Sequence, residues 1–180
     1  MRILASESIG LIIDMQEKLY PFIKDNEQLT RNTRVLIEGL KAIGVRIMVT
    51  EQYTKGLGFT IEPLKILVNE IPTIEKQAFS CCDDNLFSKE FSALSAKNVI
   101  IAGIETHVCV LQTTIDLLQQ GYQPVVIEVC VGSRNPNDKA IAIQRMRQEG
   151  AIISTYESIL FELLRYSGTD EFKRISKLVK

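Results

Sequence analysis

The sequence predicts a three-layer α/β domain built on a six-stranded, mostly parallel sheet, and three observations support this prediction. Short apolar runs, typical of strands buried on both faces, alternate with longer segments whose apolar residues recur every three or four positions. Such alternation is typical of βα units with right-handed crossovers. The 180 residues, 46% of them hydrophobic, suffice for one large core, so we expect a single domain over residues 1–180.

The first expected strand and helix are followed directly by a second strand. Residues 9–13 form an apolar run that ends at Asp14, which predicts a buried strand. Residues 26–43 carry apolar side chains at helical spacing, and Gly44 ends this helix. Residues 45–50 are again mainly apolar and predict the second strand.

A long connection separates the second strand from the third. Residues 51–72 lack a clear period and contain two glycines and two prolines, namely Gly56, Gly58, Pro63 and Pro72. A connection of this length in a compact domain is typically functional, so we expect it to border a site. A short third strand is expected at residues 73–76 and a helix at residues 86–96.

The fourth expected strand leads into a helix that carries a cysteine. Residues 98–102 read Asn-Val-Ile-Ile-Ala and precede Gly103, which predicts a buried strand. Thr106 can cap the following helix, and Gly121 stops it. Its apolar positions recur at spacings of three and four: Val108, Leu111, Ile115 and Leu118. Cys109 would thus lie among unpaired backbone N–H groups, which stabilise a thiolate and can hold an oxyanion.

The remaining elements complete the alternation. A fifth strand is expected at residues 124–131 and a helix at residues 138–148. Residues 151–155 predict the sixth strand. Helices at residues 158–166 and 170–179 close the chain.

Composition limits the partners that this chain can have. Twenty-one basic residues against 22 acidic residues give a formal charge of −1 without a basic block, so we expect neither a nucleic acid nor a membrane partner. A small-molecule substrate and other subunits remain. Asp14 interrupts the first apolar run, so no secretory signal is recognised, and we expect a cytoplasmic protein. The four cysteines form no CxxC pair, which favours reduced thiols.

The sequence also contains no nucleotide-binding motif. Neither GxGxxG nor GxxxxGK[ST] occurs, and the first strand ends in Asp14-Met15-Gln16 instead of a glycine-rich turn. We therefore expect no cofactor.

Three strand ends carry residues that together predict acyl-transfer chemistry. Asp14 ends the first strand, Lys76 ends the third and Cys109 follows the fourth, and parallel sheets gather functional side chains at this edge. An ammonium lowers the pKa of a thiol, while a carboxylate can accept the thiol proton, donate it to a leaving group and then activate water. Taken singly, each residue has an ordinary alternative role, as a turn cap, an exposed lysine or a buried packing residue.

The segments around these residues resemble the isochorismatase-like cysteine hydrolase superfamily, which also includes nicotinamidases and N-carbamoyl amide hydrolases. The matching segments span nearly the whole chain: Leu-Ile-Ile-Asp-Met-Gln, Glu-Lys-Gln-Ala-Phe-Ser, Gly-Ile-Glu-Thr-His-Val-Cys-Val and Gly-Ala-Ile-Ile-Ser-Thr-Tyr-Glu-Ser. The resemblance implies a Rossmann-like sheet of order 3-2-1-4-5-6, a homo-oligomer, and Asp14, Lys76 and Cys109 as the catalytic residues. It also implies a cis peptide at Ile104–Glu105 and an oxyanion hole formed by the backbone N–H groups of Glu105 and Cys109.

Departures from the family pattern refine this expectation. Relatives often carry a small residue at the position of Glu105, so we expect this carboxylate to point away from the thiol or to meet a cation. His107 is the one histidine, so a metal site built from several histidines is excluded by count and nicotinamidase activity is not expected. The segment Glu-Gln-Tyr, at residues 51–53, resembles the isochorismatase domain-containing branch. Isochorismatases themselves tend to lack the cysteine, so retention of Cys109 favours an amide, carbamoyl or ester substrate.

Several neighbouring residues have two interpretations. The side chains predicted either to line the substrate pocket or to pack its walls are Gln16, Gln52, Tyr53 and Phe79. Arg134 is predicted either to bind a substrate carboxylate or to form an ion pair across a subunit boundary. A Cys109–His107 dyad is not expected, because residues two apart on a helix diverge.

We therefore predict a metal-independent cysteine hydrolase and keep two alternatives. The first is a binding or scaffold protein with this fold and a weak or inactive site. The second is a thiol redox sensor that pairs Cys109 with Cys81 or Cys82.

Overall fold

The computed structural model describes residues 2–180, which form a six-stranded parallel sheet of order β3-β2-β1-β4-β5-β6. The predicted fold class and strand order are confirmed. The strands are β1 (Ser8–Ile13), β2 (Arg46–Gln52), β3 (Thr73–Lys76), β4 (Asn98–Ile104), β5 (Gln123–Gly132) and β6 (Ile152–Ser154).

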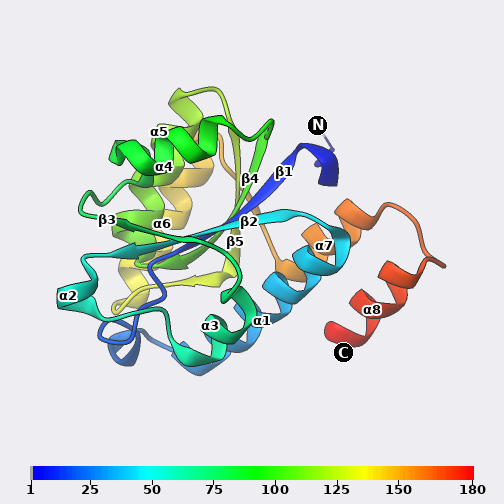
Figure 1. Cartoon of the computed structure of the whole chain (residues 1–180), viewed down its shortest axis with the longest axis horizontal. Coiled ribbons are helices and arrows are strands. Elements are labelled where there is room, and N and C mark those ends of the chain that lie inside the picture. Colours follow the sequence, from blue (N-terminus) through cyan, green and yellow to red (C-terminus); the bar gives the residue numbers. More distant parts are fainter. Residues whose placement is uncertain (1) are drawn as a thin grey trace.

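Helices cover both faces of the sheet (Figure 1). One face packs against α1 (Asn26–Ile43), α3 (Glu62–Val68), α7 (Tyr156–Leu164) and α8 (Asp170–Leu178). The other packs against α4 (Asn85–Ser92), α5 (Leu111–Gln119) and α6 (Pro136–Glu149). The side chains of β1 alternate between the two cores: Ile12 belongs to the first, and Leu11 and Ile13 to the second. Burial on both faces explains why the strands are continuously apolar.

The connection between β2 and β3 contains more regular structure than the sequence predicts. β2 continues to Gln52, and the following residues form α2 (Thr54–Leu57) and α3. Pro63 suggested an irregular loop, but it lies in the first turn of α3, where its missing N–H group is not needed. The prediction of one long connection over residues 51–72 is therefore wrong for these segments.

The junction after β4 brings the chain to the cysteine. β4 runs past the predicted end at residue 102 to Ile104, and the Ile104–Glu105 peptide bond is cis. Gly103 has φ +141°, and a Cβ atom there would lie 2.1 Å from the carbonyl oxygen of Ile13 in β1. Only glycine therefore allows β1 and β4 to approach this closely.

The helix that carries Cys109 begins with a π-helical turn, Thr106–Val110, before α5 continues it. Thr106 was predicted to cap this helix, but its buried hydroxyl has no hydrogen-bond partner within residues 2–180. That prediction is wrong, because the turn starts in a geometry that differs from an α-helical N-terminus.

Nowhere in residues 2–180 is there a helix with both the length and the apolar composition needed to span a membrane.

Candidate active site

Asp14 and Lys76 form an ion pair at the carboxyl edge of the sheet. The Lys76 Nζ atom lies 2.7 Å from Asp14 Oδ2, and neither side chain is exposed to solvent. Asp14 follows β1 and Lys76 ends β3, with β2 between them, so the lysine spans one strand to reach the acid. Asp14 has φ +51°, a left-handed conformation that is uncommon outside glycine.

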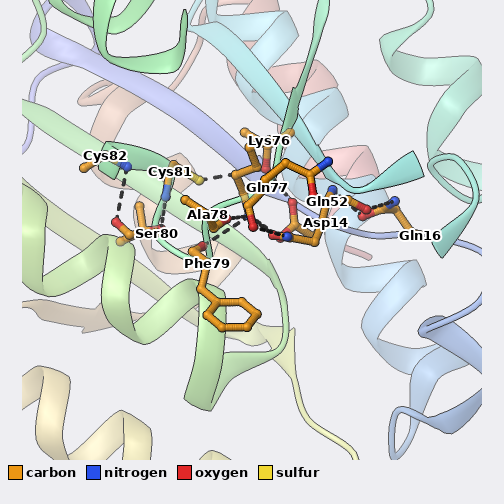
Figure 2. A network of polar contacts seen from close by, with 12 residues as sticks. Asp14, Gln16, Gln52, Lys76, Gln77, Ala78, Phe79, Ser80, Cys81 and Cys82 are labelled. Atoms are coloured by element: carbon orange, nitrogen blue, oxygen red, sulfur yellow. Dashed lines mark hydrogen bonds and ion pairs between the residues drawn. The ribbon is translucent and has the colours of Figure 1, made fainter. Parts of the chain in front are cut away.

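Lys76 also donates hydrogen bonds to three other oxygen atoms (Figure 2). Its Nζ atom lies 2.8 Å from Gln52 Oε1, 3.1 Å from the carbonyl of Ala78 and 3.2 Å from the carbonyl of Phe79. Burial alone would lower the pKa of Lys76, but the Asp14 carboxylate and the nearby thiols outweigh it, and the pKa is raised. Lys76 is therefore a fixed positive charge at neutral pH.

The thiol of Cys109 lies beside this pair. Cys109 is 6% exposed, and the charges of Asp14 and Lys76 lie near enough to act on the pKa of its thiol. Burial, followed by the charge of Asp14, raises the pKa of the Cys109 thiol above its usual range, although Lys76 acts in the opposite direction. The raised pKa favours a neutral resting thiol beside the Asp14 carboxylate, rather than the thiolate that the place of Cys109 at a helix N-terminus favours.

The π-helical turn arranges backbone donors around Cys109. The carbonyl of Glu105 accepts hydrogen bonds from the N–H groups of Val108, at 3.1 Å, and Val110, at 3.3 Å. Within residues 2–180, the N–H group of Cys109 does not donate to the Glu105 carbonyl. The N–H groups of the two residues that flank Cys109 are therefore occupied, and the prediction that Cys109 lies among unpaired N–H groups is wrong for these two.

Glu105 meets a cation, which is one of the two arrangements that the sequence suggested. Its carboxylate is buried, and Oε1 accepts hydrogen bonds from the backbone N–H of Arg134, at 3.1 Å, and from Arg134 Nε, at 3.0 Å. The Arg134 side chain is 62% exposed. The contact ties the loop after β5 to the end of β4.

His107 is engaged away from the thiol. Its Nδ1 atom lies 3.0 Å from Ser133 Oγ, and its Nε2 atom lies 4.0 Å from Asp138 Oδ2. These contacts agree with the expectation that His107 and Cys109 do not form a dyad.

The four residues predicted to surround a pocket have different positions. Gln16 is fully buried and donates hydrogen bonds to the carbonyls of Gln52 and Gly58, while its Oε1 accepts the N–H of Gln52. Both ends of this amide therefore hold backbone together, which corresponds to the wall-packing interpretation. Gln52 contacts the site directly, because its Oε1 accepts from Lys76.

Tyr53 and Phe79 are exposed aromatic residues near the site. They are 47% and 56% exposed, and they follow β2 and β3, respectively. The ring of Phe79 points away from the hydrogen-bond network, while its carbonyl contacts Lys76 (Figure 2).

Two further residues lie near the acid: Thr50 was not predicted, and Cys81 was predicted only as a possible redox partner of Cys109. Thr50 in β2 is fully buried, and its hydroxyl donates to Asp14 Oδ1 at 2.8 Å. Cys81 is also fully buried, and its Sγ atom lies 3.9 Å from Thr50 Oγ1. The only sequence signal for Thr50 is its place at the end of a predicted strand.

The thiols of Cys81 and Cys82 are held in the protonated form. Burial raises the pKa of each to about 12. Protonated thiols react slowly with peroxide, so these values do not favour the redox-sensor alternative. In the part of the chain that the structure describes, no three His, Cys, Asp or Glu side chains are grouped so as to hold a metal ion.

Comparison with known proteins gives consistent matches over nearly the whole chain. Residues 8–158 match the family model described as Isochorismatase domain. The mouse protein named Isochorismatase domain-containing protein 2A is 36% identical over 181 residues, which cover 99% of this chain and 85% of that protein.

Two solved structures are also similar. A structure described as MAR1 ribonuclease from Caenorhabditis elegans is 37% identical with a TM-score of 0.93, covering 99% of this chain and 92% of that one. A structure of YcaC from Pseudomonas aeruginosa, with hexane-2,5-diol and covalent acrylamide, is 25% identical with a TM-score of 0.92, covering 98% and 91% of the two chains.

Proposed function

Because the chain belongs to the isochorismatase family of hydrolases, we propose that it is a metal-independent cysteine hydrolase of a small amide, carbamoyl or ester substrate. The observation that carries this proposal is the buried Asp14–Lys76 ion pair, whose charges lie near enough to the Cys109 thiol to act on its pKa. A nucleophile, a base and a fixed cation then share one buried site.

In the first half of the proposed reaction, the sulfur of Cys109 attacks the carbonyl carbon and its proton passes to Asp14. The N–H groups of Glu105 and Cys109 stabilise the oxyanion that forms. The bond to the leaving group then breaks, and Asp14 returns the proton to the departing nitrogen or oxygen. The product of this half is a thioester on Cys109.

In the second half, Asp14 takes a proton from water as the water attacks the thioester. The carbon–sulfur bond breaks, the acid is released and Cys109 regains its proton. Lys76 keeps its charge throughout and stabilises the carboxylate form of Asp14, supported by its contact at 2.7 Å.

A neutral resting thiol is compatible with this sequence of steps. Proton transfer to Asp14 accompanies attack, so no thiolate has to persist in a buried site. The acyl-enzyme, rather than an ionised sulfur, is therefore the species to detect.

Stopped-flow turnover of p-nitrophenyl acetate tests the proposal, followed by a screen of small amides and carbamoyl compounds. We expect a burst of p-nitrophenolate equal to the enzyme concentration and an acetyl group on Cys109 in the intact mass spectrum. Cys109→Ala and Asp14→Asn should lose both. Cys130→Ala, which removes a buried thiol from the opposite core, should keep them.

Equal turnover by wild type and Cys109→Ala would overturn the covalent mechanism. Absence of a burst and of turnover with every substrate would favour the scaffold alternative.

The similarity to the structure described as a ribonuclease supports RNA cleavage as a second candidate function. The formal charge of −1 weighs against it, because RNA binding relies on basic surfaces. Cleavage of a labelled RNA by wild type but not by Cys109→Ala would favour this candidate. Equal cleavage by both proteins would indicate a contaminating nuclease.

We also propose that the chain forms a homo-oligomer, as the family resemblance implies. Light scattering of the purified protein tests this, and a monomeric mass at micromolar concentration would contradict it.

A further inference from the structure

The carboxylate of Asp14 is held by a different donor at each oxygen. Thr50 Oγ1 donates to Oδ1 at 2.8 Å, and Lys76 Nζ donates to Oδ2 at 2.7 Å. The backbone adds a third link, because the N–H of Asp14 donates to the carbonyl of Thr50 at 3.1 Å. A carboxylate held at both oxygens and at its own backbone cannot turn about its side-chain bonds without breaking a buried hydrogen bond.

Cys81 completes the surroundings of the Thr50 hydroxyl. The Cys81 Sγ atom lies 3.9 Å from Thr50 Oγ1, and the backbone N–H of Cys81 donates to Thr113 Oγ1 at 3.0 Å, which ties this residue to α5. Burial raises the pKa of Cys81 to about 12, so the thiol remains a donor at neutral pH. With Cys81 donating to its oxygen, Thr50 has its single hydroxyl proton directed at Asp14.

We propose that Thr50 is a positioning residue that fixes the orientation of Asp14 toward Cys109. The inference rests on the proposed function, because it gives Thr50 its role through the proposed base. Thr50 is fully buried and directs its hydroxyl proton at Asp14, so it acts on the reaction through Asp14. Lys76 alone would fix one oxygen and leave the carboxylate free to turn about that contact.

The same hydrogen bond affects the ionisation of Cys109. The charged or titratable groups that face the thiol are Asp14, Lys76 and Cys81, and the Asp14 charge opposes formation of the thiolate. Donation from Thr50 disperses part of that charge. Removal of the hydroxyl should therefore move the ionisation of Cys109 to higher pH.

Alkylation of Cys109 by iodoacetamide, followed by peptide mass spectrometry across neutral and alkaline pH, tests this proposal. Thr50→Val keeps the shape of the side chain and removes the hydroxyl. We expect its alkylation to be about tenfold slower than that of wild type at a given pH, with the profile moved by about one unit to higher pH. Thr50→Ser restores the donor and should stay within about threefold of wild type.

Thr114→Val is the matched control. Thr114 is fully buried in α5, and its hydroxyl has no partner within residues 2–180, so the same substitution removes no hydrogen bond there. It should leave the alkylation profile unchanged.

A Thr50→Val profile that superimposes on that of wild type would overturn the proposal, as would an equal shift in Thr114→Val. Far-UV circular dichroism shows whether each variant is folded. If Thr50→Val does not fold, Thr50→Ala takes its place with the same expected shift.

Alkylation needs no substrate, so this test separates the two proposals. A shifted profile in a protein without hydrolytic activity would support the positioning role and count against the proposed function. A full burst with p-nitrophenyl acetate and an unshifted Thr50→Val profile would support the proposed function and overturn the positioning role of Thr50.

Discussion

Replacement of Lys76 by methionine tests whether the buried ion pair holds the site together. Methionine has nearly the length of lysine but carries no charge and donates no hydrogen bond. The substitution leaves the carboxylate of Asp14 fully buried, with the Thr50 hydroxyl as its remaining side-chain donor.

The size of the effect follows from burial. Removal of one partner of a buried ion pair costs about 3–5 kcal/mol, because the other charge is left in a low-dielectric environment. Gln52 and the carbonyls of Ala78 and Phe79 also lose a donor, but water can reach the partly exposed Gln52. We therefore expect Lys76→Met to lower the free energy of unfolding by about 3–5 kcal/mol.

Urea denaturation followed by far-UV circular dichroism measures this loss, since the chain contains no tryptophan for fluorescence. Lys97→Met is the matched control. The Lys97 Nζ atom lies 2.6 Å from Glu7 Oε1, but the Lys97 side chain is 70% exposed, and an exposed pair contributes at most about 1 kcal/mol. Asp14→Asn in the Lys76→Met background removes the unpaired charge and should recover about 2 kcal/mol.

Two results would refute this reasoning. The first is a loss for Lys76→Met no larger than that for Lys97→Met. The second is a double variant with Asp14→Asn that is no more stable than Lys76→Met alone.

Three further perturbations test other features of the structure. Gly103→Ala should cost at least about 3 kcal/mol in urea denaturation, because its Cβ atom would collide with the backbone of β1, whereas Gly44→Ala, with φ +82° and open space, should cost about 1–2 kcal/mol. The free energy of unfolding should fall above about pH 8.5, because Cys81 ionises in the unfolded chain but keeps its proton in the folded one. This thiol contributes about 2 kcal/mol of that loss by pH 10. In Cys81→Ala the free energy of unfolding should therefore fall less steeply with pH. Arg134→Ala should cost about 1–2 kcal/mol, because it leaves the buried Glu105 carboxylate without its cation, and Glu105→Gln in that background should restore most of the loss.

The ends of β1 and β3 could be predicted, because a charged residue marks each of them. Ile12 and Ile13 precede Asp14, and β3 ends at Lys76, so each functional side chain marks the place where its strand leaves the core. The order of the strands came from the family resemblance, since alternation of strands and helices does not specify which strands are neighbours.

The ionisation of Cys109 could not be predicted from its place in the chain. An N-terminal position in a helix favours a thiolate, and this suggested a lowered pKa. In the folded protein Cys109 is 6% exposed and the charge of Asp14 acts on its thiol, and both effects raise the pKa. The sequence contains neither the depth of burial nor the proximity of this charge.

The hydrogen bond between Asp14 and Thr50 could not be predicted for a related reason. Thr50 reaches Asp14 because Ile13 pairs with Thr50 in the parallel register of β1 and β2. Register depends on how two distant segments align, and a shift of one residue would turn the Thr50 side chain to the opposite face.

The position of Lys76 on β3 has a consequence for how the protein loses its site. β3 has four residues and lies at the edge of the sheet, with β2 as its single neighbouring strand. Edge segments of this kind open locally at a lower free energy than the central strands, without unfolding the rest of the molecule. Fraying of β3 would withdraw the cation from Asp14, while β1 and β4 still hold the acid and the thiol. Warming or mild denaturant should therefore inactivate the site well before the rest of the protein unfolds.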